Sequence, residues 1–573
     1  MKTPGNADEL RLKLAKELER KRALLIDRHP NARNSLRIML SALGVTAVHN
    51  AGSSAEVLRQ VKAHQFDIIL SDYQLEDGRD GQQLLEELRQ QRLISLATVF
   101  IIITSERSYH NVVSVAELAP DDYLIKPFTA DELQGRLVRA LYKKGFFAQL
   151  YEQLDNGAFT EALATCNRLL ALETAFQFDV LRIKGEVLNT LGRHTEAREV
   201  YDEVLRQRLV PWAKMGLAMA LRGEQQLLEA EMVGQSLIDD FPEFTAAYDF
   251  LAEVQDELGK AGDAQETLQR AAAISPNNSK RQRLVGDVAT RNNDLAAAER
   301  AYGNVLERRR GSTLNSIDDY TNLSRVMVER GHTEAAKRVT DELRRDWRGN
   351  KQGELAALVM EGLCAEKEGD SAKAKRAVEQ AIALHETLSQ EGNATPVSQK
   401  VTLDLAKACL ATGNEAVAQE IVRKVAAENH ENRAMIAEVQ NIYTKAGKEG
   451  KGQDLLAQVG REIVELNNRG VLAARSGDIQ GSVQLLAEAA DRVPNLQFLI
   501  NATKAIFTLL DVKGWDANLA ARGVRYLELA QAKDIRDQRV ISAREFYQRV
   551  ARKYGVSIVP LTGGRKGGEK PAS

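Results

Sequence analysis

Glycine recurs at a nearly constant interval through most of this chain, and this recurrence restricts the fold more than any other feature. Glycines that separate helical segments fall at nine positions: Gly157, Gly192, Gly223, Gly259, Gly331, Gly369, Gly413, Gly447 and Gly477. Asn293 fills the place between Gly259 and Gly331. The mean interval is about 36 residues, which predicts a stack of similar helix pairs, each burying its apolar face against the next.

Large and small side chains also alternate within single units of this repeat. One unit places the following residues at regular positions: Tyr248, Leu251, Ala252, Gly259, Ala264, Leu268, Ala271 and Pro276. The pattern resembles the tetratricopeptide repeat, in which small residues let two helices approach and large ones fill the seam between units. The resemblance predicts an all-α superhelical solenoid over residues 145–510, with further helices over 511–556. An irregular all-helical domain is the alternative.

The N-terminal part of the chain, residues 22–144, has a different pattern. Five short apolar runs alternate there with amphipathic segments: 23–27, 45–49, 66–72, 98–104 and 122–125 for the runs, and 34–43, 54–64 and 81–90 for three of the segments. Short continuous apolar runs are typical of strands buried on both faces. The alternation predicts a doubly wound, five-stranded parallel sheet with its functional site beyond the carboxyl ends of the strands.

Polar side chains stand at the ends of four of these runs. Asp27 ends the first run, Asp72 the third and Thr104 the fourth, and Lys126 follows the fifth directly before Pro127. With these residues in this order, residues 22–144 resemble the receiver domain of two-component response regulators, whose fold is flavodoxin-like. The whole chain then resembles a receiver domain fused to tetratricopeptide repeats.

The resemblance implies a role for each of these residues. Asp72 accepts a phosphoryl group from an upstream histidine kinase or phosphotransfer protein, and Lys126 and Thr104 contact the phosphoryl oxygens. Tyr123, three residues before Lys126, turns inward when Thr104 moves toward the phosphate. Such a transfer depends mainly on positioning and charge stabilisation. We expect a signalling adaptor that catalyses only its own phosphorylation and is not otherwise an enzyme.

The metal site implied by the resemblance is altered in this sequence. Receivers bind Mg²⁺, here through Asp27, Asp72 and the backbone carbonyl of Gln74, but Arg28 replaces the second acidic ligand. Mg²⁺ binding is therefore expected to be weak or absent. In one hypothesis Asp72 is still phosphorylated; in another, Arg28 pairs with Asp72 and leaves a phosphorylation-independent pseudo-receiver scaffold. Arg28 could also turn outward and cover surface with its aliphatic stem.

We expect the helical part of the chain to act by binding another protein. A superhelical stack can hold a protein partner on its concave face, and Asn467, Asn468 and Arg475 are candidate contacts there. Basic clusters at 280–283 and 308–310 raise nucleic-acid binding as a third function. We interpret them as solvated surface, because mixed-charge helices produce such runs by chance.

Composition limits the remaining possibilities. The formal net charge is −2, so the chain has no global attraction for nucleic acid, and none is expected as a partner. Three cysteines far apart in sequence indicate a reducing compartment. With no long apolar stretch, we expect a cytoplasmic protein without a membrane partner. Residues 1–21 are expected to form a charged helical extension and residues 557–573 a disordered tail. The sequence identifies neither the kinase, the output partner, the pathway nor the oligomeric state.

Overall fold

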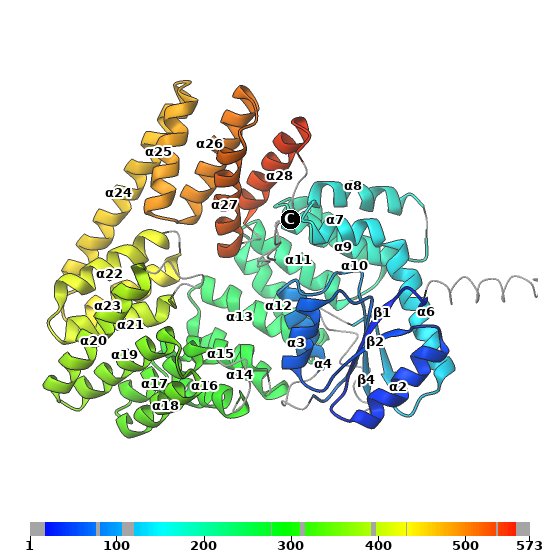
Figure 1. Cartoon of the computed structure of the whole chain (residues 1–573), viewed down its shortest axis with the longest axis horizontal. Coiled ribbons are helices and arrows are strands. Elements are labelled where there is room, and N and C mark those ends of the chain that lie inside the picture. The colour runs from blue at the N-terminus through cyan, green and yellow to red at the C-terminus, as the bar shows by residue number, and fades with distance from the viewer. Residues whose placement is uncertain are drawn as a thin grey trace, which may run out of the picture. The chain divides into compact units, whose positions relative to one another are not determined.

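The computed structural model combines a five-stranded sheet near the N-terminus with helices from there onward (Figure 1). It describes residues 18–75, 81–105, 120–172, 174–276, 278–309, 316–390, 397–430, 432–534 and 537–556. The chain divides into two compact units, Met1–Asn315 and Ser316–Ser573. Most of the expected N-terminal extension (residues 1–17) and the expected disordered tail (557–573) lie outside the described residues.

The sheet of the first unit is entirely parallel, with the strand order β2-β1-β3-β4-β5. Its strands are β1 (Arg22–Ile26), β2 (Ala47–Ala51), β3 (Ile68–Asp72), β4 (Val99–Thr104) and β5 (Asp122–Ile125). The doubly wound prediction is confirmed. The second strand begins two residues later than expected, because Val45 is buried in the turn where its N–H closes the preceding helix on Leu40.

Helices cover both faces of the sheet (Figure 1), and four of them lie within the described residues. Their bounds are α2 (Pro30–Ala42), α3 (Ser54–Ala63), α4 (Gly81–Gln90) and α6 (Ala130–Phe146). Leucines of α2 and α6 pack on one face, and valines and leucines of α3 and α4 pack on the other. Helix α2 begins at Pro30, earlier than the predicted residue 34, because proline suits the first helical position, where no intrahelical N–H bond is needed.

The rest of the first unit is an array of helix pairs. Its helices are α7 (Ala148–Asp155), α8 (Phe159–Leu170), α9 (Gln177–Thr190), α10 (His194–Gln207), α11 (Pro211–Gly223), α12 (Leu227–Asp240), α13 (Thr245–Glu257), α14 (Ala261–Ile274), α15 (Ser279–Arg291) and α16 (Leu295–Arg309). Phe147 caps both α6 and α7, so the last helix on the sheet runs almost directly into the array.

Helices continue through the second unit. They are α17 (Ile317–Glu329), α18 (Thr333–Asp346), α19 (Lys351–Lys367), α20 (Ser371–Gln390), α21 (Gln399–Ala411), α22 (Glu415–Glu428), α23 (Arg433–Lys445), α24 (Glu449–Arg475), α25 (Ile479–Arg492), α26 (Leu496–Lys513), α27 (Ala517–Lys533) and α28 (Gln538–Lys553). The domain limits expected at residues 144 and 510 fall inside α6 and α26, and they stay predictions. None of the described helices is long and apolar enough to cross a membrane.

Glycines inside the helices make room for aromatic rings of neighbouring helices. Tyr201 of α10 is 1% exposed and lies against Gly185 of α9 and Gly216 of α11. A β-carbon added to Gly185 would stand 2.5 Å from the tyrosine ring, far inside van der Waals contact. Tyr302 lies against Gly286 in the same way. The small residues of the repeat thus fix how closely successive helices approach.

The inter-helix turns follow the predicted period with one correction. Eight of the nine expected glycines, and Asn293, have the positive φ angle that glycine and asparagine adopt most readily. The exception is Gly223, which is the last residue of α11 and lies against the ring of His194. Gln225 takes the positive φ in that turn, so from 157 to 192, 225, 259 and 293 the steps are 35, 33, 34 and 34 residues.

Candidate functional site

The candidate site lies at the carboxyl ends of the central strands. Asp27 follows β1, Asp72 is the last residue of β3, Thr104 is the last residue of β4, and Lys126 follows β5. Strands β1 and β3 are neighbours although β2 lies between them in sequence, so the chain changes direction across the sheet there. This switch point is where open α/β sheets place their ligand sites.

Lys126 joins the two aspartates. Its Nζ lies 3.0 Å from Oδ1 of Asp72 and 3.2 Å from Oδ2 of Asp27. The backbone N–H of His29 donates to the other Asp27 oxygen at 2.8 Å. Asp27 is 1% exposed, whereas the side chains of Asp72 and Lys126 are 13% and 34% exposed. The site therefore opens to solvent on the side of Asp72.

The charge state of Lys126 follows from these contacts. Partial burial of its ammonium would lower the pKa, but the hydrogen bond to Asp72 and the charges of Asp72 and Asp27 outweigh burial and raise the pKa above its ordinary value. Lys126 is therefore a fixed positive charge at neutral pH. Among the described residues, no hydrogen bond reaches the second carboxylate oxygen of Asp72.

Arg28 does not pair with Asp72 in this structure. Its side chain is exposed, and its Nε donates to Nε2 of the neighbouring His29 at 3.0 Å. Another arginine, Arg33 of α2, donates to the backbone carbonyl of Asp27. The arrangement corresponds to the outward position considered for Arg28 from the sequence, and among the described residues Lys126 is the cation that contacts Asp72.

Gly81, the first residue of α4, packs closely on the backbone of Asp72, a contact that the sequence alone did not predict. Its N–H donates to the carbonyl of Tyr73 at 2.7 Å, and a β-carbon on Gly81 would stand 2.8 Å from the carbonyl oxygen of Asp72. Most of the segment between Asp72 and Gly81, residues 76–80, lies outside the described residues. The start of α4 is thereby packed directly on the backbone of Asp72.

Thr104 and Tyr123 lie on neighbouring strands beside the aspartates. Thr104 is 4% exposed, and its carbonyl accepts a hydrogen bond from the N–H of Lys126 at 2.7 Å. Tyr123 is also 4% exposed and packs in one apolar cluster with Leu84 and Leu88 of α4. The ring thus occupies the inward position that the resemblance associates with a switch.

The donor atoms of the site fit Mg²⁺ in kind but are few. Asp27, Asp72 and the carbonyl of Gln74 offer carboxylate and carbonyl oxygens, which are the ligands of this ion. Lys126 already faces both carboxylates within 3.2 Å. Within the described parts of the chain, no three acidic, histidine or cysteine side chains gather as a metal site. Any Mg²⁺ bound here would keep several of its water molecules.

One arginine of the basic cluster at 280–283 proves to be structural. Arg281 is 3% exposed and makes two hydrogen bonds of 2.8 Å to the carboxylate of Asp249 on α13. It is thus neither a nucleic-acid contact nor the solvated surface that the sequence suggested. The side chains of the other cluster, 308–310, lie outside the described residues.

Ion pairs of the second unit link helices that are not sequential neighbours. Arg325 of α17 donates to both carboxylate oxygens of Asp404 on α21, from Nε at 2.7 and 3.0 Å. Glu329 of α17 accepts from Lys407 of α21 at 2.8 Å and from Lys445 of α23 at 3.1 Å. Ion pairs therefore join α17 to α21 and α23. A partner that binds to this face would have to compete with these ion pairs.

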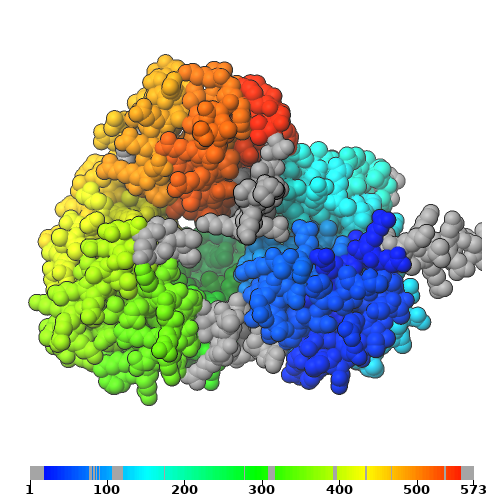
Figure 2. Space-filling model, in the orientation of Figure 1, coloured from blue at the N-terminus to red at the C-terminus, as the bar shows by residue number. Residues whose placement is uncertain are grey.

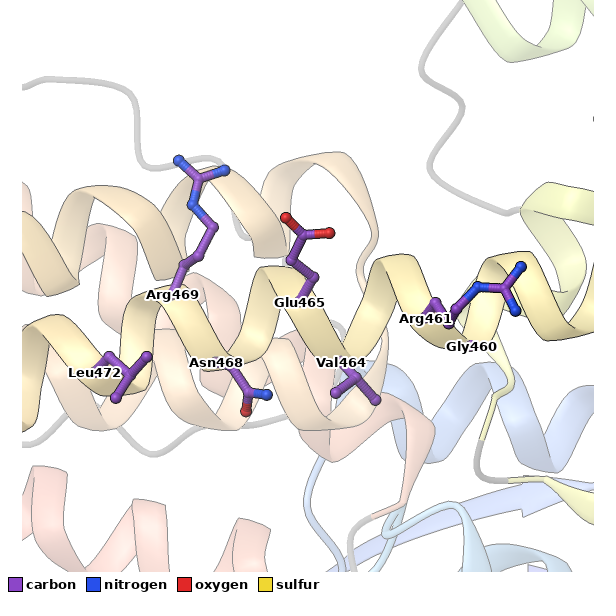
Figure 3. A pocket seen from close by; sticks show the side chains of 7 residues that line it. All are labelled: Gly460, Arg461, Val464, Glu465, Asn468, Arg469 and Leu472. Carbon is purple, nitrogen blue, oxygen red and sulfur yellow. The ribbon is translucent and has the colours of Figure 1, made fainter.

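An open pocket of about 540 Å³ lies along α24 (Figure 3). It is lined by Gly460, Arg461, Val464, Glu465, Asn468, Arg469 and Leu472. Asn468, a candidate contact, thus borders it, whereas Asn467 is engaged by the side chain of Asn501 at 2.6 Å. Because a single helix supplies all its walls, the pocket is a partly apolar helix face rather than an enclosed site.

Comparison with known proteins identifies two regions of the chain. The response regulator receiver domain family matches residues 23–138, and the tetratricopeptide repeat family matches residues 147–211. Receiver domains generally bind Mg²⁺ and interact with histidine kinases or phosphotransfer proteins, and tetratricopeptide repeats mediate protein interactions.

Curated relatives align with limited parts of the chain. A probable transcriptional regulator, ycf27, of Cyanidium caldarium is 32% identical over 114 residues, which are 20% of this chain and 43% of that protein. The response regulator ArlR of Staphylococcus aureus is 26% identical over 185 residues, covering 29% of this chain and 80% of ArlR. The chain thus spans less than half the length of ycf27.

Solved structures similar to this chain are tetratricopeptide repeat proteins. The C-terminal part of one from Cytophaga hutchinsonii is 16% identical with a TM-score of 0.35, covering 42% of this chain and 95% of that one. One from Parabacteroides merdae is 13% identical with a TM-score of 0.32, covering 52% and 98%. From the family matches and the fold, the chain consists of a response regulator receiver domain at residues 23–138 followed by a helical array that begins with tetratricopeptide repeats at residues 147–211.

Proposed function

We propose that this protein is a response regulator that accepts a phosphoryl group on Asp72 and uses it to control protein binding by the helical array. The observation that carries the proposal is the contact of Lys126 with both Asp72 and Asp27 at the switch point of the sheet. A partly exposed carboxylate beside a fixed cation is the arrangement that a phosphoryl acceptor needs.

Each polar side chain has a part in the proposed transfer. A carboxylate oxygen of Asp72 forms a bond to the phosphorus of a phosphohistidine as the phosphorus–nitrogen bond breaks, and the departing imidazole takes up a proton. Lys126 stabilises the charge on the phosphoryl oxygens, and Thr104 donates a hydroxyl hydrogen bond to one of them. Tyr123, which is already buried, would keep its inward position in the state that the phosphoryl group favours.

Mg²⁺ would strengthen the site where it binds. Asp27, Asp72 and the backbone carbonyl of Gln74 are the residues that would hold it, and the ion would supply further positive charge to the phosphoryl oxygens. With Arg28 in place of an acidic ligand, one negative charge is missing from the ligand set. We therefore propose that phosphorylation occurs at higher Mg²⁺ concentrations than a site with three carboxylates would need.

The alternative is a phosphorylation-independent scaffold in which Arg28 neutralises Asp72. The orientation of Arg28 favours phosphorylation, because its guanidinium contacts the ring of His29, whereas Lys126 contacts Asp72. The array is proposed to bind a protein, in keeping with a signalling or adaptor role without further enzymatic activity. Because the ion pairs of Glu329 and Arg325 occupy the face formed by α17, α21 and α23, we expect the partner to bind another surface of the array.

Incubation with acetyl phosphate and Mg²⁺ tests the proposal. Intact-mass spectrometry should show one added phosphoryl group on the wild type and none on Asp72→Asn. Asp67→Asn is a matched control, because Asp67 is another aspartate of the same domain that pairs with Lys21 away from the site. Failure of the wild type to gain a phosphoryl group at any Mg²⁺ concentration would favour the scaffold.

A further inference from the structure

The receiver domain and the first repeats are joined by a small polar cluster at the amino-terminal edge of the sheet. This cluster, here named the junction latch, consists of Ser95, Leu96, Lys144 and Asp155. Asp155 ends α7, which lies within the region matched by the repeat family, and Ser95 and Leu96 lie in the loop between α4 and β4. In the space-filling view, the receiver (blue) and the first repeats (cyan) meet directly (Figure 2).

Residues of α6 and α7 both form hydrogen bonds with Ser95 and Leu96. Oγ of Ser95 donates to the carboxylate of Asp155 at 2.6 Å, and the N–H of Leu96 donates to the same carboxylate at 3.1 Å. Lys144 at the end of α6 donates to the carbonyl of Leu96 at 2.7 Å. One peptide segment of the receiver is therefore held by two successive helices.

Lys144 is buried where it makes these contacts. Its side chain is 10% exposed, and its Nζ pairs at 2.8 Å with Asp121, the residue directly before β5. The same Nζ lies 4.9 Å from the ring centre of Tyr151 on α7. Asp121 in turn accepts from the N–H of Phe100 on β4 at 2.8 Å. A buried ammonium with these partners fixes the position of α6 and α7 against the two last strands.

Helix α4 connects the latch with the phosphoacceptor site. Its first residue, Gly81, packs on the backbone of Asp72, and its last turn carries Arg89, which donates to the carbonyl of Ser95 and, at 3.1 Å, to that of Thr98. Between these ends, leucines of α4 share an apolar cluster with Tyr123. A helix of ten residues spans about 15 Å. Movement at Asp72 would thus displace the loop that the latch holds.

We propose that the junction latch transmits the phosphorylation state of Asp72 through α4 to the first repeats, α7 to α9. This inference rests on the proposed function, since it requires phosphorylation. It goes further by naming α4 and Asp155 as the route and by placing the response in the repeats nearest the receiver. Asp155 acts as a positioning residue, because it touches neither the phosphoryl group nor the metal ligands.

Hydrogen exchange on the full chain, with and without acetyl phosphate and Mg²⁺, tests the latch. The phosphorylated fraction is measured by intact mass in the same samples. In the wild type, phosphorylation should change the exchange rate of peptides from α7 to α9 by about fivefold or more. The change should disappear in Asp155→Ala and in Ser95→Ala at an equal phosphorylated fraction. Glu152→Ala, on the exposed side of the same helix, should behave as the wild type.

A second readout needs no phosphorylation. Losing a hydrogen bond to a carboxylate should speed exchange of peptides that contain Leu96 by about tenfold or more in Asp155→Ala. A phosphorylated wild type with unchanged exchange in α7 to α9, or an Asp155→Ala variant that keeps the full response, would overturn the latch alone. A wild type that takes up no phosphoryl group would instead overturn the proposed function, and the transmission with it.

Discussion

Removal of Lys126 should destabilise the strands that carry the two aspartates. At an effective dielectric constant near 20, charges 3.0 and 3.2 Å apart attract by about 5 kcal/mol each. Desolvation of the three groups offsets most of this attraction. Losing one partner of a buried ion pair costs about 3–5 kcal/mol. Because Lys126 is about one-third exposed and its charge is partly screened, we expect Lys126→Ala to lower the stability of these strands by about 2–3 kcal/mol.

The loss of stability caused by Lys126→Ala should depend on the charge of Asp72. With Asp72→Asn already present, Lys126→Ala leaves one uncompensated carboxylate instead of two, and the additional loss should fall to about 1–2 kcal/mol. The difference between the two backgrounds is the coupling of Lys126 with Asp72. Lys62→Ala, which removes an exposed lysine of the same domain, is a control expected to change stability by less than about 0.5 kcal/mol.

Native-state hydrogen exchange of β1 and β3 amides is the suitable assay, because a chain of two compact units need not unfold in a single two-state step. The free energy of opening of these strands is compared among wild type, Lys126→Ala, Asp72→Asn and the double variant. Equal losses for Lys126→Ala in both backgrounds would refute the reasoning, since the lysine would then act independently of Asp72.

Three further predictions concern the metal site, the repeats and the second unit. Arg28→Asp should tighten Mg²⁺ binding by about tenfold or more, since it restores an anionic ligand; unchanged affinity in calorimetry would count against that role. Gly216→Ala should lower stability by about 1–3 kcal/mol, because its new methyl group overlaps the ring of Tyr201; a thermal melt as high as the wild type's would contradict this. Burial raises the pKa of Glu329, but the charges and hydrogen bonds of Lys407 and Lys445 outweigh it and hold the pKa below its ordinary value. Its stabilising contribution is therefore present above the ordinary glutamate pKa and lost as pH falls through the lowered one. Urea unfolding of Glu329→Gln should show a deficit at neutral pH that shrinks as the pH falls below the ordinary glutamate pKa, and a deficit independent of pH would exclude the ion pairs as its cause.

The parts of the fold that depend on local pattern could be predicted from the sequence. Apolar runs located all five strands, and β5 has the predicted limits, Asp122 to Ile125, with Lys126 directly after them. The period of the turns located the helix pairs. Val45 was predicted to begin the second strand and Gly223 to lie in an inter-helix turn. In the structure, Val45 fills a buried turn and Gly223 packs against His194.

The site was less predictable where contacts join distant parts of the chain. The grouping of Asp27, Asp72 and Lys126 followed from their places at the strand ends, but the orientation of Arg28 depends on the ring beside it. In the sequence, Lys144 marked only the end of the expected receiver domain. Its burial against Asp121 and Leu96 arises from the packing of α6 and α7, which no local pattern encodes.

The central claim, that Asp72 receives the phosphoryl group, can be tested at the residue itself. Borohydride reduces an acyl phosphate to a primary alcohol, so phosphorylated aspartate becomes homoserine and can be located by peptide sequencing in a mass spectrometer. After treatment with acetyl phosphate and Mg²⁺, the account predicts homoserine at position 72 in the wild type and nowhere else in the receiver domain. Homoserine at another aspartate, or an unmodified Asp72 under conditions that phosphorylate the chain, would contradict it.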